Sequence, residues 1–307
     1  MDTRLLRYFV AVAEERHFGR AAERLNMAQP PLSQQIKQFE QSLGFKLLER
    51  TTRRVDLTPA GELVLTRGRR ILQDMDELAV SAARVAAGAE GVLRIGFSGS
   101  ATYRLMPYII REAHARMPGL DLVVQGEMLT PEMELALDEH RIDLAILRPP
   151  VRSSGVRLRF LERDELVAIV PADSPWAQRG VIDLADLADE PFVCYPPGSA
   201  VSSLFQRACQ EAGFLPEIVQ VASETSTLMS LVAAGVGSAL LPGSTRQFAA
   251  SDLVFRPLAR PVQVDLALAW CPDRETPLVR NFVSLFDSIA LPEQESERGA
   301  RPQEETP

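Results

Sequence analysis

The chain has 307 residues, with 33 lysines and arginines against 41 aspartates and glutamates, and a net charge of −8, which argues against indiscriminate binding of nucleic acid over the whole surface. Three cysteines without CxxC spacing and three scattered histidines exclude a disulfide framework and a metal cluster, and fit a reducing cytosol. No apolar run reaches the roughly 18 residues that a membrane span needs, so no membrane partner is expected.

The first predicted element is a helix near the amino end. Its apolar residues share one helical face, and Glu14, Glu15 and Arg16 follow where a signal peptide would be cleaved. That face consists of Leu5, Leu6, Phe9, Val12 and Ala13. We therefore expect a folded helix and a cytoplasmic protein rather than an exported one.

Residues 18–43 predict two short amphipathic helices at a sharp angle, a helix-turn-helix. Apolar residues recur at i, i+3, i+4 and i+7 on both segments: Phe18, Ala21, Ala22 and Leu25, then Leu32, Ile36, Phe39 and Leu43. The opposite face of the second helix has donors and acceptors and no carboxylate, as contacts with base edges and phosphates require; it consists of Ser33, Gln34, Lys37, Gln38 and Gln41. The alternative is the solvated face of an ordinary helical hairpin.

Residues 45–57 predict a β-hairpin, or wing, with Arg50, Arg53 and Arg54 at or near its tip. Beside a helix-turn-helix, a basic hairpin touches the DNA backbone or minor groove; the alternative is a basic surface loop. Residues 1–60 carry ten basic and seven acidic groups, a net charge of +3, which leaves −11 for the rest of the chain. Attraction for phosphates is therefore confined to the amino end.

Thr58 and Pro59 predict the start of a long helix, because threonine caps well and proline is tolerated at the first helical position. Apolar and small residues follow at alternating spacings of four and three: Val64, Gly68, Ile71, Met75, Leu78, Ala82 and Val85. This heptad seam favours pairing with a second subunit. The alternative is packing of the seam against the chain's own body. Residues 88–91 end the helix as a linker.

From residue 92 onward, predicted strands alternate with predicted helices, which indicates an α/β body with mostly parallel sheets, long enough for two small subdomains with a cleft between them. The strands are expected at residues 93–97, 120–127, 143–147, 166–171, 192–195, 218–222, 236–241 and 262–270. The helices are expected at residues 103–117, 132–139, 203–212, 225–234 and 278–289. The polar tail, residues 293–307, is expected to be disordered.

The carboxyl ends of these strands predict a binding cleft. Several lead into helix starts that bear serine or threonine, where free N–H groups favour an anion. We expect a small carboxylate to be bound by Ser100, Thr130 and the fork-shaped cation of Arg148, with Ser199 and Ser202 on the facing subdomain. An apolar wall is expected from Leu105, Leu129, Val201 and Phe205. The alternative is that Ser100 and Thr130 only cap their helices and that Arg148 pairs with a neighbouring acid.

The chain resembles the LysR-type transcriptional regulators. The resemblance is most specific in residues 4–58, and its later motifs follow in the same order. The motifs are Phe9-Val-Ala-Val-Ala-Glu, Ala21-Ala-Glu-Arg-Leu, Gln29-Pro-Pro-Leu-Ser-Gln-Gln-Ile, Leu47-Leu-Glu-Arg, Leu57-Thr-Pro-Ala-Gly, Leu93-Arg-Ile-Gly-Phe, Arg141-Ile-Asp-Leu-Ala-Ile and Val232-Ala-Ala-Gly-Val-Gly. The spacing most resembles the subgroup that controls degradation of aromatic compounds, whose inducers include benzoate- and muconate-like acids.

The resemblance implies a winged helix-turn-helix (residues 1–58), a dimerising linker helix (59–88) and a two-subdomain effector domain shaped like periplasmic solute-binding proteins (92–292). It places DNA contacts at Gln29, Pro30, Pro31, Ser33 and Gln34, with Phe18 before them, Lys37 on a phosphate and Arg53 on the wing. It further implies a cytoplasmic activator without a cofactor, switched by a small-molecule inducer and acting with RNA polymerase. Its dimers, or dimers of dimers, would bind an interrupted inverted repeat in double-stranded DNA.

Two other classes fit less well. A solute-binding transport protein would explain the body alone, and it requires an export signal and no helix-turn-helix. An enzyme is disfavoured because the sequence contains no Gly-x-Ser-x-Gly elbow, HExxH pair or P-loop.

Overall fold

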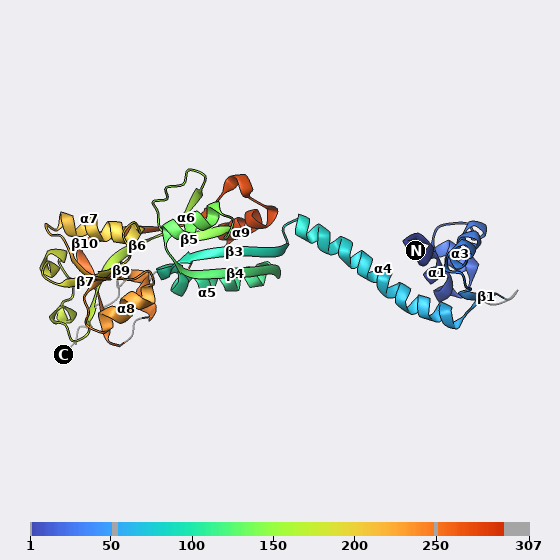
Figure 1. Cartoon of the computed structure of the whole chain (residues 1–307), viewed down its shortest axis with the longest axis horizontal. Helices are drawn as coiled ribbons and strands as arrows, with labels where there is room; N and C mark the ends of the chain where they lie inside the picture. Colours follow the sequence, from blue (N-terminus) through green and yellow to red (C-terminus); the bar gives the residue numbers. More distant parts are fainter. Residues whose placement is uncertain (1, 51–54, 249–250, 292–307) are drawn as a thin grey trace, which may run out of the picture. The chain divides into compact units, whose positions relative to one another are not determined.

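The computed structural model describes residues 2–50, 55–248 and 251–291, and the chain divides into two compact units between Arg84 and Val85 (Figure 1). Each unit has its own apolar core. None of the helices in these ranges is both long and apolar enough to cross a membrane.

The amino-terminal unit is built on three helices, α1 (Thr3–Glu15), α2 (Phe18–Arg24) and α3 (Gln29–Leu43), whose apolar faces meet in one core. The predicted face of α3 is the buried one, since Leu32, Ile36 and Phe39 are fully buried. The turn from α2 to α3 passes through Asn26 at φ 52°, a left-handed conformation that asparagine tolerates. The predicted helix-turn-helix is therefore formed.

The predicted wing is an antiparallel hairpin of β1 (Leu48–Arg50) and β2 (Val55–Leu57). The Glu40 carboxylate of α3 accepts hydrogen bonds from the backbone N–H groups of Leu47 and Leu48, at 2.9 and 3.0 Å, which fix the start of the hairpin against the helix. The predicted tip residues Arg53 and Arg54 lie outside the described residues.

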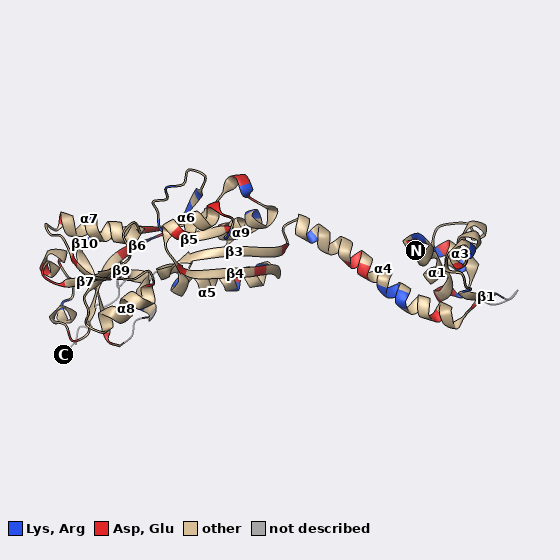
Figure 2. Ribbon diagram, viewed as in Figure 1, with Lys and Arg blue, Asp and Glu red and all other residues tan. Residues whose placement is uncertain are grey.

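The predicted linker helix is α4 (Pro59–Ala86), which begins as expected, with the Gly61 N–H donating to Thr58 Oγ1 at 2.9 Å. Its first turns pack on the amino-terminal core, and a Cβ added to Gly68 would come within 2.8 Å of a Leu6 methyl carbon. Further along, the seam is open to solvent: Met75 is 40% and Leu78 69% exposed. Figure 2 shows little charge in the last turns of α4, which suits burial against a partner.

The second unit begins with β3 (Glu90–Ser98), α5 (Gly99–Arg116), β4 (Gly119–Met128), α6 (Thr130–Asp138), β5 (Leu144–Leu147) and β6 (Arg157–Pro171). It continues with β7 (Pro191–Cys194), α7 (Ala200–Glu211), β8 (Glu217–Val221), α8 (Thr225–Ala233), β9 (Ala239–Pro242), β10 (Leu253–Trp270) and α9 (Pro277–Ser288). Short 3-10 helices lie at Pro175–Gln178, Leu184–Leu187, Gly243–Phe248 (η3) and Pro272–Arg274.

The expectation of mostly parallel sheets is wrong. Within the described residues, the main sheet has six strands in the order β4-β3-β5-β10-β6-β9, and only β4-β3 and β3-β5 are parallel. The sequence pattern missed the lengths of β6 and β10, because charged residues such as Arg163 and Asp164 interrupt their apolar alternation. These two long strands pair with each other in antiparallel orientation, which makes this part of the main sheet antiparallel.

Two subdomains follow from this topology (Figure 1). The carboxyl end of β10 pairs with β5 beside the core that α5 and α9 cover, whereas the carboxyl end of β6 pairs with β9 beside the cores that contain α7 and α8. The two long strands thus cross between the subdomains side by side. The parallel pair β7–β8 belongs to the second subdomain.

Candidate effector pocket and nucleic-acid interface

The first turn of α3 presents a polar surface to solvent. Gln29, Gln34 and Lys37 are exposed and Ser33 is half-buried. Pro30 and Pro31 occupy the first turn and are exposed, and the residue before the helix, Ala28, provides no side-chain cap. Because proline has no backbone N–H, only Gln29 and Leu32 can offer free N–H groups in the first turn of α3.

Phe18 has a different position from the other predicted DNA-contacting residues. It begins α2, is half-buried, and packs against the amino-terminal core. Its ring therefore positions α2, and through it the turn that leads to α3.

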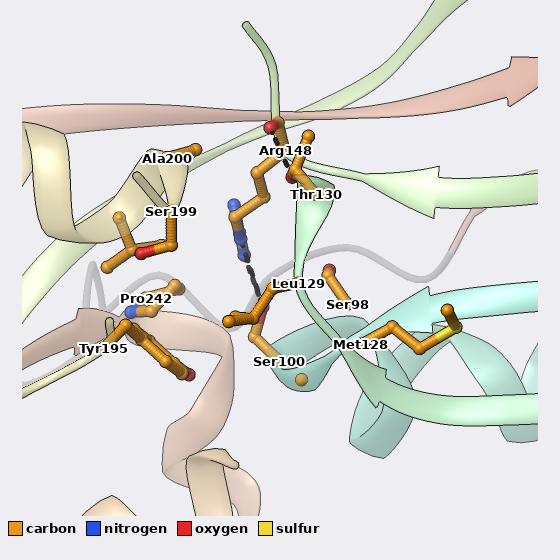
Figure 3. Close-up of a pocket in the computed structure, with 12 residues that line it drawn as sticks. Ser98, Ser100, Met128, Leu129, Thr130, Arg148, Tyr195, Ser199, Ala200 and Pro242 are labelled. Atoms are coloured by element: carbon orange, nitrogen blue, oxygen red, sulfur yellow. Dashed lines mark hydrogen bonds between the residues drawn. The ribbon is translucent and has the colours of Figure 1, made fainter. Parts of the chain in front are cut away.

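A pocket lies where strands of both subdomains end (Figure 3). Two helices of the first subdomain and one of the second begin at its wall: β3 and β4 lead into α5 and α6, and β7 leads into α7 through the loop at residues 195–199. The lining residues are Ser98, Gly99, Ser100, Met128, Leu129, Thr130, Arg148, Tyr195, Ser199, Ala200, Val201 and Pro242. The structure thus brings Ser100, Thr130, Arg148 and Ser199 together around one space.

Arg148 is almost fully buried, at 3% exposure, and its guanidinium is engaged by the protein. Its Nη2 lies 3.3 Å from Asp164 Oδ2 and 2.6 Å from Ser100 Oγ, and its Nη1 donates to the Val264 carbonyl at 3.3 Å. Burial lowers the pKa of Arg148, while the negative charge of Asp164 opposes that shift. The alternative pairing considered for Arg148, with a neighbouring acid, is the one observed.

Neither Ser100 nor Thr130 caps its own helix. Thr130 Oγ1 donates to the Arg148 carbonyl at 2.8 Å, and Ser100 Oγ accepts from the Arg148 guanidinium. Ser199 does cap a helix, since its Oγ accepts from the Ser202 N–H at 3.1 Å at the start of α7. The helix starts of α5 and α6 therefore keep N–H groups without a side-chain cap facing the pocket.

Two buried hydroxyls near the pocket have no hydrogen-bond partner among the described residues. Ser98 Oγ, at the wall of the pocket, belongs to a residue that is 7% exposed, and Ser202 Oγ, in the first turn of α7, to one that is 2% exposed. Ser202 does not line the pocket. An unpaired buried hydroxyl is costly, so the Ser98 hydroxyl, which lines the pocket, suits a polar ligand.

The apolar side of the pocket is smaller than predicted. Leu129 and Val201 line it, whereas Leu105 and Phe205 are buried in the hydrophobic cores. Met128 and the ring of Tyr195 supply further apolar surface that the sequence reasoning missed. Burial raises the pKa of Tyr195 to about 12, and its hydroxyl shares a 2.6 Å hydrogen bond with Thr225 at the start of α8.

A second polar cluster joins the subdomains beside the pocket. The Glu127 carboxylate at the end of β4 accepts from the Tyr103 hydroxyl on α5, and from the N–H (3.3 Å) and hydroxyl (3.0 Å) of Ser226 on α8. Glu127 itself is left-handed, with φ 55°, and its N–H donates to Thr102 Oγ1. The sequence carried no signal for this cluster, because α5 and α8 are more than 100 residues apart.

The comparison with known families matches both units. Residues 3–62 match the bacterial regulatory helix-turn-helix protein of the lysR family, and residues 86–289 match the LysR substrate binding domain. The chain is 36% identical over 302 residues to the HTH-type transcriptional regulator AlsR of Bacillus subtilis, covering 97% of this chain and all of that protein. It is 37% identical over 269 residues to the HTH-type transcriptional regulator BenM of Acinetobacter baylyi, covering 85% and 86% of the two chains.

Among solved structures, full-length CbnR in complex with its target DNA matches with a TM-score of 0.81 and 26% identity, covering 94% of this chain and 99% of CbnR. The winged helix-turn-helix and the two-subdomain pocket thus define a DNA-binding transcriptional regulator with an effector-binding domain. The chain belongs to the LysR family, whose matched relatives are regulators and not enzymes.

Proposed function

We propose that this regulator is controlled by a small carboxylate that binds in the pocket between the two subdomains. The observation that carries the proposal is the convergence of three helix starts on one space that also has a buried, unpartnered hydroxyl, Ser98. Helix starts stabilise a negative charge through free N–H groups and aligned dipoles. The apolar surface of Met128, Leu129 and Val201 suits the hydrocarbon part of an aromatic or muconate-like acid.

For DNA, the proposal assigns base readout to Gln29, Ser33 and Gln34 in the first turns of α3, supported by their exposed or half-exposed positions. Pro30 and Pro31 shape that turn, Phe18 positions the preceding helix, Lys37 contacts a phosphate, and Arg53 acts from the wing. Glutamine matches adenine with two hydrogen bonds in the major groove.

The assembly we propose is a dimer through α4, and a dimer of dimers on an interrupted inverted repeat. The exposed apolar seam of α4 supports the dimer. The protein would activate transcription together with RNA polymerase, in the cytoplasm, where its DNA lies. In support, the 33% identical relative HcaR of Escherichia coli is an operon transcriptional activator. We assign residues 1–58 to DNA binding, 59–88 to dimerisation and 92–292 to the effector.

Operator binding tests the DNA part. Fluorescence anisotropy should show tighter binding to the DNA upstream of the regulator's own gene than to a scrambled duplex. Gln29→Ala and Ser33→Ala should each cost about 1–3 kcal/mol on the upstream DNA and little on the scrambled duplex. Gln73→Ala on α4 is the control and should leave both affinities unchanged. Equal losses on the two duplexes would refute base readout.

A thermal-shift screen tests the effector part. Benzoate, succinate and cis,cis-muconate should include an acid that raises the melting temperature of the full chain, because a ligand stabilises the state that binds it. Leu129→Trp, which narrows the pocket, should remove that shift and keep operator binding. If none of the three acids stabilises the protein, the proposed carboxylate class is wrong.

A further inference from the structure

Arg148 is the cation that the sequence predicts to bind the effector, but its charge is balanced by the carboxylate of Asp164. Asp164 lies against the same guanidinium nitrogen that binds Ser100, and Asp164 also accepts hydrogen bonds from the N–H and hydroxyl of Ser244 in η3. The pair is buried and stays within the protein. An incoming carboxylate would therefore meet the positive helix starts but a neutralised arginine.

A second arginine, Arg152, does not line the pocket but lies near Gly198, the residue before the lining residue Ser199. Arg152 follows β5 on the loop that leads to β6, and its guanidinium reaches towards the loop before α7. A Cβ added to Gly198, the residue next to the lining residue Ser199, would lie 4.0 Å from Arg152 Nη2. Arg152 thus extends from the side of Arg148 to the facing subdomain.

The backbone beneath Arg152 is held in place by a buried acid. The Glu134 carboxylate of α6 accepts hydrogen bonds from the N–H groups of Arg152 and Ser153, the latter at 2.8 Å. The Glu134 carboxylate is thus hydrogen-bonded to the backbone of Arg152 and not to its guanidinium. The loop position is therefore defined by the fold, while the side chain is exposed to solvent.

The described residues place no acidic partner on the Arg152 guanidinium. Among the described residues, its guanidinium forms no ion pair or hydrogen bond, and it lies near the start of α7, the positive end of a helix of 12 residues. Two positive groups in proximity repel, and an anion between them relieves that repulsion. The unpartnered, buried hydroxyl of Ser98, which lines the same pocket as Ala200 and Val201, points independently to a polar ligand there.

We infer that Arg152, rather than Arg148, is the cation that recognises the effector's anionic group. The anion lies at the α7 end of the pocket, between the Arg152 guanidinium and the N–H groups of Ala200 and Val201. Arg148 is a positioning residue, which holds Ser100 and, through its carbonyl, Thr130 in the lining. This inference rests on the proposed binding of a small carboxylate.

Calorimetric titration of the full chain with benzoate, succinate and cis,cis-muconate tests it. Arg152→Gln should weaken binding of the acid that the wild-type protein binds best by at least tenfold, and Arg152→Lys should restore most of the affinity. The matched control is Arg141→Gln, which removes one charge from an exposed arginine before β5, paired with Glu139 and at the opposite end of that strand. It should leave the affinity unchanged. Unliganded melting temperatures show that each variant is folded.

The results for these variants distinguish the role of Arg152 from the binding of a carboxylate in the pocket. If Leu129→Trp abolishes acid binding but Arg152→Gln binds like wild type, the pocket stands and the role of Arg152 is refuted. If Arg141→Gln loses as much affinity as Arg152→Gln, the effect is one of general charge, and the inference is equally refuted. If the wild-type chain binds none of the three acids, this result refutes both the proposed carboxylate effector and the role of Arg152.

Discussion

The carboxylate of Glu14, on α1, forms ion pairs with one arginine on α2 and one on α4, and so links three helices of the amino-terminal unit. Its carboxylate lies 2.7 Å from Arg24 on α2 and 2.6 Å from Arg69 on α4. Partial burial opposes its ionisation, but the hydrogen bonds from the two arginines outweigh burial and lower the pKa of Glu14. The contacts therefore favour the charged carboxylate in the folded chain.

This shift predicts a pH dependence of stability. Because the pKa of Glu14 is lower in the folded than in the unfolded chain, its contribution is complete above the unfolded value and is lost as the pH falls through the folded value. Glu14→Gln should lower the melting temperature at pH 7 by an amount worth no more than about 1 kcal/mol, since both arginines are half-exposed. Calorimetry should show this difference vanish in acid.

The control for Glu14 is Glu23→Gln on α2, an exposed acid for which the described residues show no ion pair. It should leave the melting temperature unchanged at both pH values. A difference for Glu14→Gln that persists undiminished in acid would contradict the assigned role of its charge.

The linker helix α4 is packed at its start and exposed further along. Its first turns are tied to the amino-terminal core through Gly61 and Gly68, while Ile71, Met75 and Leu78 remain exposed along one line. An exposed stripe of this kind is stable in water when a second helix covers it.

The double variant Ile71→Asp with Leu78→Asp should therefore convert the regulator to monomers, because two buried like charges in the seam would repel their counterparts. Light scattering after size exclusion measures the mass directly. The matched control places the same two charges one helical face away, as Gln73→Asp with Val80→Asp, and should keep the wild-type mass. A dimer that survives in the first variant would show that the interface lies elsewhere.

At the scale of the whole molecule, the Glu127 cluster joins the two subdomains of the second unit. Glu127→Ala removes an acceptor of the Tyr103 hydroxyl and of the Ser226 N–H, and because Ser226 is exposed and Tyr103 half-buried, we expect a loss of about 0.5–1.5 kcal/mol in the stability of the unit. We also expect a changed affinity for the acid that stabilises the wild-type chain, because Tyr195 in the pocket lining bonds to Thr225, the neighbour of Ser226. Denaturant unfolding and titration measure the two effects.

The control for this cluster is Glu217→Ala on the exposed strand β8, which should change neither quantity. An unchanged free energy of unfolding in Glu127→Ala would show that the cluster carries no stability.

Local patterns were enough to predict the amino-terminal unit. Periodicity identified the helix-turn-helix, Thr58 marked the start of α4, and strand ends located Ser100, Thr130, Arg148 and Ser199 around one pocket. The rest depends on contacts between distant segments, which a sequence pattern does not encode. Asp164, the partner of Arg148, sits on a strand interrupted by charges, and its side chain is buried only because β10 and η3 enclose it.

The two long strands that link the subdomains limit how the pocket can change. β6 and β10 are hydrogen-bonded to each other over most of their length, and their register shifts between Pro257 and Val262 and again between Leu266 and Ala267. Neither strand can slide alone without breaking its ladder to the other. We therefore expect any rearrangement on effector binding to twist or bend both strands together at those two irregularities. The two subdomains would then rotate slightly relative to each other, and the displacement of their atoms would grow with distance from the paired strands.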